Sequence, residues 1–65
     1  MNQKVQRTAE VEAIEIVGEV TAELVSVAER LPVPADKAEE TARILDRLSE
    51  ELAEAAGMIR VAATP

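Results

Sequence analysis

Three glutamates, Glu50, Glu51 and Glu54, are the side chains whose type and spacing could do chemistry. Carboxylates at positions i, i+1 and i+4 of a helix lie close enough to share a divalent cation, and Mg²⁺ is bound through carboxylate oxygens. The neighbouring apolar residues favour another interpretation. If Leu48 and Leu52 face a helical core, Glu50 and Glu54 point into solvent, as charged residues on outer helix faces usually do. We therefore predict neither a metal site nor a cofactor.

The Glu50–Glu54 segment locally resembles the E-E-x-x-E motif that binds Mg²⁺ in helical nucleotide pyrophosphohydrolases. The resemblance covers five residues, and the chain lacks a second acidic motif to complete it. Glu15, Glu19 and Glu23 are spaced at fours along a polar face and do not match. A small metal-dependent hydrolase using Glu50, Glu51 and Glu54 is therefore the less favoured alternative.

The residue types present give little support to nucleophilic catalysis. The chain has no His and no Cys, so Ser26 and Ser49 lack the base that activates a serine. Arg43, Arg47 and Arg60 could form an anion site across a dimer. However, Arg43 and Arg47 alternate with acidic residues, which favours salt bridges along the helix. The sequence therefore predicts a protein that is not an enzyme.

The charge distribution argues against direct binding to nucleic acid. Seven basic and 13 acidic residues give a net charge of −6, divided into +2 for residues 1–7, −5 for residues 8–33 and −3 for residues 34–65. An acidic chain repels phosphate backbones. An acidic inhibitor that mimics nucleic acid is an alternative function, because no basic residue lies between Arg7 and Arg30. A charged exterior that keeps an oligomer soluble explains the same charges.

The elements that must position these side chains are two long helices. From about Lys4 to Leu31 only Gly18 disfavours a helix, by about 1 kcal/mol relative to Ala. Two rows of mostly apolar residues with heptad spacing lie side by side on it, since adjacent helix positions are about 100° apart. The first row is Ala13, Val17, Val20, Leu24, Val27 and Leu31, and the second row is Val11, Ile14, Gly18, Thr21, Val25 and Ala28.

The first helix is expected to end at Leu31-Pro32-Val33-Pro34, because residues before proline avoid the α region. Pro34 suits the first turn of a second helix. Asp36 with Glu39 either caps that helix or complements its dipole.

The second helix is expected over about residues 35–62, and to continue past Gly57. Glu39 and Arg43 form a favourable i,i+4 pair on it. A single row with heptad spacing follows its length: Ala38, Thr41, Leu45, Leu48, Leu52, Ala55, Ile59 and Ala62.

The predicted fold is all-α, a single domain of residues 1–65. Helices over about 4–31 and 35–62 are joined by a turn at 32–34 into an antiparallel hairpin. A chain of 65 residues with no aromatic residue and no Cys builds only a small core. Packing the second helix onto one row of the first leaves the other row exposed. The simplest closure is a homodimeric four-helix bundle with twofold symmetry.

We therefore predict a non-enzymatic protein–protein interaction module, a small scaffold, adaptor or regulator, whose partner is a copy of itself. A helix of another protein is an alternative occupant, because helix-in-groove binding uses the same spacing. The residues expected to carry self-association are Val11, Ile14, Val17, Gly18, Thr21, Leu24, Val25, Ala28, Leu45, Leu48, Leu52 and Ile59.

The expected location is the cytoplasm, and no membrane partner is expected. Residues 1–20 contain no continuous apolar segment of the kind that secretory signals have. No apolar run approaches the roughly 18 residues of a membrane span. The absence of Cys fits a reducing compartment, and the abundance of Ala, Glu, Val and Arg is typical of proteins from high-GC bacteria.

Overall fold

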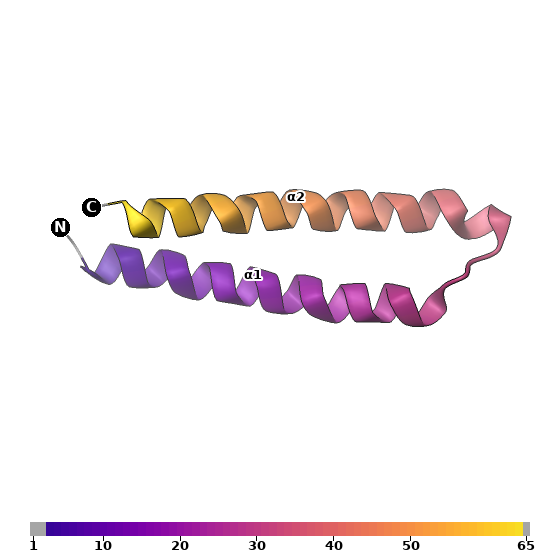
Figure 1. Cartoon of the computed structure of the whole chain (residues 1–65), viewed down its shortest axis with the longest axis horizontal. Coiled ribbons are helices and arrows are strands. Elements are labelled where there is room, and N and C mark those ends of the chain that lie inside the picture. The colour runs from indigo at the N-terminus through magenta and orange to yellow at the C-terminus, as the bar shows by residue number, and fades with distance from the viewer. Residues whose placement is uncertain (1–2, 65) are drawn as a thin grey trace.

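Two antiparallel helices make up most of the chain (Figure 1). The computed structural model describes the backbone of residues 3–64 and the side chains of residues 8–64, so the side chains of Lys4 and Arg7 lie outside this description. Helix α1 spans Gln3–Arg30, a short 3₁₀ helix η1 spans Ala35–Lys37, and α2 spans Ala38–Ala63. The predicted all-α hairpin is confirmed. Its two chain ends lie at one end and the connection at the other.

The connection between the two helices extends further than predicted on its C-terminal side, because η1 precedes α2. Pro34 is extended, with φ −60° and ψ 155°, and η1 follows it before α2 begins. The amide of Lys37 donates to the carbonyl of Pro34 at 2.9 Å. No side-chain cap hydrogen bond precedes η1 or α2, so Asp36 does not cap the helix. Glu39 and Glu40, in the first turn of α2, are left to complement its dipole.

The course of α2 agrees with the prediction. The helix continues through Gly57 and ends at Ala63. After it, the amide of Thr64 donates to the carbonyl of Val61 at 3.2 Å. The expected pair forms, with Arg43 Nε 3.2 Å from Glu39 Oε1.

The core is a single line of side chains between the helices. Every seventh residue on each helix is buried, which matches two turns of a supercoiled helix. Leu48 and Val20 are the largest fully buried side chains, each 1% exposed. The complete set of buried residues among those described is Ala13, Val20 and Val27 on α1, and Leu48, Ala55 and Ala62 on α2. Three of the six are alanines, so the core is thin.

The predicted rows need a correction, because the first row of α1 and the row of α2 are buried only at alternate positions and the second row of α1 is exposed throughout. On α1 the buried members of the first row are flanked by the half-buried Ile16 and Glu23, not by Val17 and Leu24. Glu23 faces α2 because its carboxylate accepts a hydrogen bond from Arg47 on that helix. The rotation that permits this contact turns the other first-row residues away from α2.

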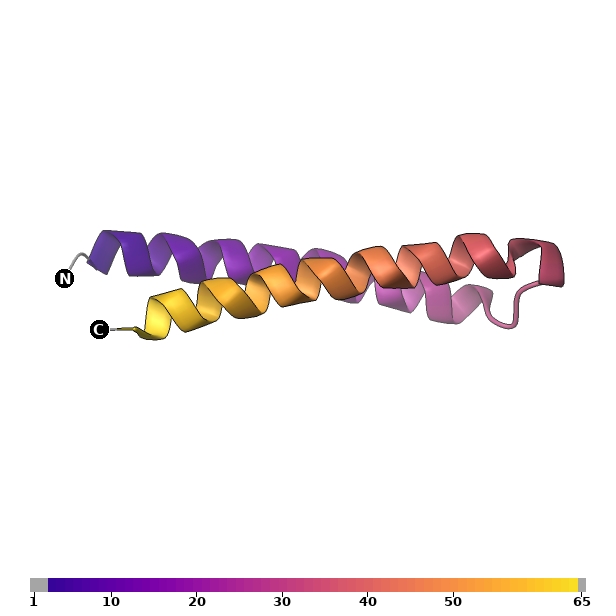
Figure 2. The same ribbon diagram turned by 90° about the horizontal axis from the view of Figure 1, so that it is seen from above.

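The hairpin is long and thin. Its principal extents are 51 × 16 × 11 Å and its radius of gyration is 15.2 Å, whereas a compact domain of this length has a radius of about 11 Å. Figure 2, turned by 90° from Figure 1, shows the two helices crossing at a shallow angle in a single layer. Within residues 3–64, neither helix has the length of uninterrupted apolar sequence that crossing a membrane requires.

Candidate functional site

One long side of the hairpin carries large apolar side chains from both helices. Seven residues there are between 39% and 70% exposed. Residues seven positions apart share a side of each helix, because seven residues make two turns. We call this surface the apolar face, and it consists of Ile14, Val17 and Leu24 on α1, Leu31 directly after α1, and Leu45, Leu52 and Ile59 on α2.

A hollow near the chain ends shows that the two helices contribute to the same surface. Ile59 of α2 lines it together with Ile14, Val17 and Gly18 of α1, the charged Glu10 lies at the same hollow, and the volume of the hollow is about 500 Å³. The leucines of the face follow Ile59 and Val17 at seven-residue steps toward the connection. The apolar face therefore runs most of the length of the hairpin.

Small side chains border the apolar face on both helices. No member of the face or of this border is charged, and the border residues are Thr21 and Ala28 on α1, with Ala42, Ser49 and Ala56 on α2. The hydroxyl of Thr21 donates to the carbonyl of Val17 at 2.7 Å, so the side-chain donor is satisfied within α1. Small residues allow helix axes to approach to the short end of the usual 8–10 Å range.

The opposite side of the hairpin is polar. There Arg47 of α2 forms a hydrogen-bonded ion pair with Glu23 of α1. Lys37 Nζ lies 3.8 Å from Glu40 Oε2. We call this side the polar edge. The two long sides of the hairpin therefore differ in chemistry, one apolar and one charged.

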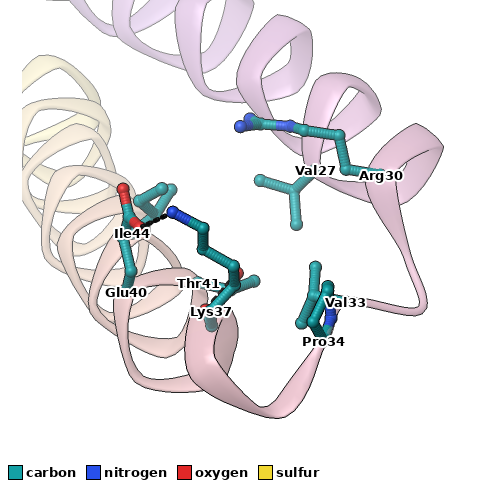
Figure 3. A pocket seen from close by; sticks show the side chains of 8 residues that line it. All are labelled: Val27, Arg30, Val33, Pro34, Lys37, Glu40, Thr41 and Ile44. Atoms are coloured by element: carbon teal, nitrogen blue, oxygen red, sulfur yellow. Dashed lines mark hydrogen bonds and ion pairs between the residues drawn. The ribbon is translucent and has the colours of Figure 1, made fainter.

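A hollow of about 290 Å³ lies on the polar edge beside the connection. Figure 3 shows Val27 and Val33 directed into it, with Arg30 of α1 at one side and the Lys37–Glu40 pair of η1 and α2 at the other. Arg30 donates to the carbonyl of Ser26 at 3.2 Å and to its Oγ at 3.3 Å. Both cations at this hollow thus have partners within the chain.

The three glutamates singled out for metal chemistry do not gather into a site. Glu50 and Glu54 are exposed and Glu51 is half-buried. Among residues 3–64 no three acidic side chains lie close enough together to hold a metal ion. The geometry therefore gives the metal-dependent hydrolase alternative no support.

The twelve residues predicted to carry self-association fall into four groups. Six of them belong to the apolar face, and Thr21 and Ala28 belong to its border. Val11, Gly18 and Val25 lie further around α1, where Val11 is 47% and Val25 is 54% exposed. Leu48 is buried between α1 and α2, so within the hairpin it serves the core.

Sequence reasoning missed Ile16 and Glu23 as residues that contact α2. The available signal was the match between charges, since Glu23 is the acidic residue of α1 that meets Arg47. Heptad spacing alone does not show this, because Ile16 and Val17 continue the same pattern equally well. Whether Ile16 or Val17 faces α2 determines which apolar residues remain exposed.

Comparison with known proteins adds no relative to this description. Family models, curated proteins and solved structures were all searched, and none of them matches the chain.

Proposed function

We propose that this chain is a non-enzymatic protein–protein interaction module, which self-associates through the apolar face into a homodimeric four-helix bundle. Its role is that of a small scaffold, adaptor or regulator in the cytoplasm. In the bundle, each hairpin covers the apolar face of the other, and the two polar edges remain in solvent.

The observation that carries the proposal is the size of the exposed apolar surface. The seven residues of the apolar face are each between 39% and 70% exposed, whereas the largest apolar patch on a typical monomer is only about 300–600 Å². The whole chain exposes 5042 Å². A compact folded protein of 7.0 kDa exposes about 4,000 Å². The difference is comparable to the area of about 800 Å² that each partner buries in a standard interface.

The composition of the core supports the same proposal. Among the residues described, only two side chains larger than Ala are fully buried. They are Val20 and Leu48, each 1% exposed. Small domains with so little buried apolar surface usually gain stability from oligomerisation, disulfides or metals. The sequence has no Cys, so association with another hairpin is the route that its residue types allow.

A matched pair of variants tests the apolar face. Leu52→Glu places a charge in the middle of the face, where the residue is 40% exposed. Val61→Glu introduces the same charge on the polar side of α2, where the residue is 61% exposed. Sedimentation velocity over a range of concentrations measures the fraction of dimer for both variants and the parent.

We expect a dimer for the parent and for Val61→Glu, and a monomer or unfolded chain for Leu52→Glu. A parent that is a helical monomer at micromolar concentration, or equal association of both variants, contradicts the proposal. Stable association of the parent with a different protein, without any self-association, would favour a helix of another protein as the occupant.

A further inference from the structure

We infer that the two hairpins pack with their connections at the same end, so that α1 of each copy lies against α2 of the other. This inference rests on the proposed dimer and specifies its partner surface. It follows from the positions of the charged residues on the two helices.

Two twofold arrangements bring the apolar faces of two copies together. With the symmetry axis along the length of the hairpin, both connections lie at one end and α1 packs on α2 of the other copy. With the axis across the hairpin, the connections lie at opposite ends. In that case α1 packs on α1 of the other copy, and α2 packs on α2. Both arrangements bury the same residues, so apolar burial does not choose between them.

Each helix carries six acidic and three basic residues, but the basic residues are placed differently, since Lys4, Arg7 and Arg30 lie at the two ends of α1. From Thr8 to Glu29, α1 carries six glutamates and no basic residue. Helix α2 also carries six acidic residues, but it contains Arg43, Arg47 and Arg60 as well. All three arginines are exposed, and so are Glu10, which lines the hollow on the apolar face, and Glu15 and Glu29 of α1.

Packing α1 against α1 of a second copy therefore brings together two stretches, residues 8–29 of each copy, that contain no basic residue. Like charges placed together across an interface are unfavourable, and arrangements with complementary potentials are preferred. Packing α1 against α2 of the other copy separates these two stretches to opposite corners of the bundle. Each stretch then has α2, with its three arginines, on both sides.

The heights of individual residues along the hairpin agree with the arrangement in which both connections lie at one end of the bundle. Within one hairpin, Ile59 and Glu10 line the same hollow, so they lie at the same height along the hairpin. A twofold axis along the length of the hairpin keeps each residue at the same height in both copies. It therefore places Arg60 of one copy level with Glu10 of the other, at the end where the chain ends lie.

A single spin label near the connection measures the arrangement directly. The chain has no Cys, so Ala35→Cys provides one labelling site per copy at an exposed position of η1. Pulsed dipolar spectroscopy then gives the distance between the two labels in the dimer. Ala53→Cys, exposed near the middle of α2, is the matched control, because its labels lie within about 35 Å in either arrangement.

We expect a distance of about 20–30 Å at position 35, as for two connections at one end of a four-helix bundle. A distance near the 51 Å length of the hairpin, with a short distance at position 53, overturns the inference and leaves the dimer intact. The absence of a dipolar signal at both positions overturns the proposed dimer itself.

Discussion

Arg47 on α2 donates a hydrogen bond to the carboxylate of Glu23 on α1, and this contact joins the two helices across the polar edge. Turning Glu23 toward α2 turns Val17 and Leu24 toward the other long side of the hairpin. One ion pair and the apolar face are therefore two consequences of the same helix rotation.

The Glu23–Arg47 pair should contribute little to stability, although it marks the helix rotation. Its side chains remain 46% and 54% exposed, and exposed ion pairs are worth about 0.2–1 kcal/mol. We expect Glu23→Gln and Arg47→Gln to show a coupling free energy below about 1 kcal/mol in a double-mutant cycle. Urea unfolding of the four proteins measures it.

The Glu39–Arg43 pair is the matched control for this cycle. It lies within one helix and is 77% exposed on both sides, so its coupling should be about 0.3–0.5 kcal/mol. A coupling above about 2 kcal/mol for Glu23 and Arg47 would contradict the view that apolar packing, rather than the ion pair, holds the helices together.

Leu48 should be the most sensitive position of the core. It is 1% exposed, and truncating such a leucine to Ala costs about 2–5 kcal/mol, through lost transfer free energy and a residual cavity. A core this small has little stability to lose, so we expect Leu48→Ala to lose most of its helical circular dichroism at 25 °C. Leu48→Met preserves volume and should cost less than about 1.5 kcal/mol. A Leu48→Ala variant as helical and stable as the parent would refute the assigned core.

Sequence patterns were sufficient to predict the hairpin. Leu31-Pro32-Val33-Pro34 separates two segments with heptad spacing, and α1 and α2 end within a few residues of the predicted limits. Gly57 did not end α2, because Ile59 and Ala62 continue its apolar spacing beyond the glycine. Local propensity and spacing carry this much information about a helix.

The rotation of the helices could not be predicted from spacing. Val17 and Ile16 extend the buried line of Ala13 and Val20 equally well, so α1 has two equivalent contact faces by pattern alone. In the structure, α1 packs through the face that includes Glu23. Glu23 contacts Arg47, which lies 24 positions later in the sequence. A pairing between distant residues is absent from the local pattern, and it decides which apolar side chains form the candidate site.

Gly57 and Gly18 should both be replaceable by Ala with a gain in stability. An added Cβ at either glycine meets nothing within 4 Å, and both positions lie inside helices. Replacing Gly by Ala within a helix stabilises it by about 0.5–1 kcal/mol, because the unfolded chain loses backbone freedom. Thermal unfolding of the two variants measures the gain. Destabilisation by Gly18→Ala alone would indicate that a second copy packs directly over Gly18 at the hollow on the apolar face.

Dimerisation should strengthen as ionic strength rises. Each chain carries a net charge of −6, so association brings two strongly acidic molecules together. The Debye length falls from about 30 Å in 0.01 M salt to about 10 Å in 0.1 M salt. The hairpin is 16 Å wide and 11 Å thick, so charges on the two copies repel across the bundle only at the lower ionic strength. We expect the dissociation constant, measured by sedimentation equilibrium, to fall several-fold over this range.

The double variant Glu15→Lys/Glu19→Lys separates this repulsion from other effects of salt. Each substitution adds two positive units, so the net charge changes from −6 to about −2, and the repulsion between copies nearly disappears. Both residues are exposed and lie outside the apolar face, so the buried surface is unchanged. The variant should associate more tightly than the parent in 0.01 M salt and respond weakly to added salt. If the parent and the variant respond equally, net charge does not oppose assembly, and the charge argument for packing α1 against α2 of the other copy loses its basis.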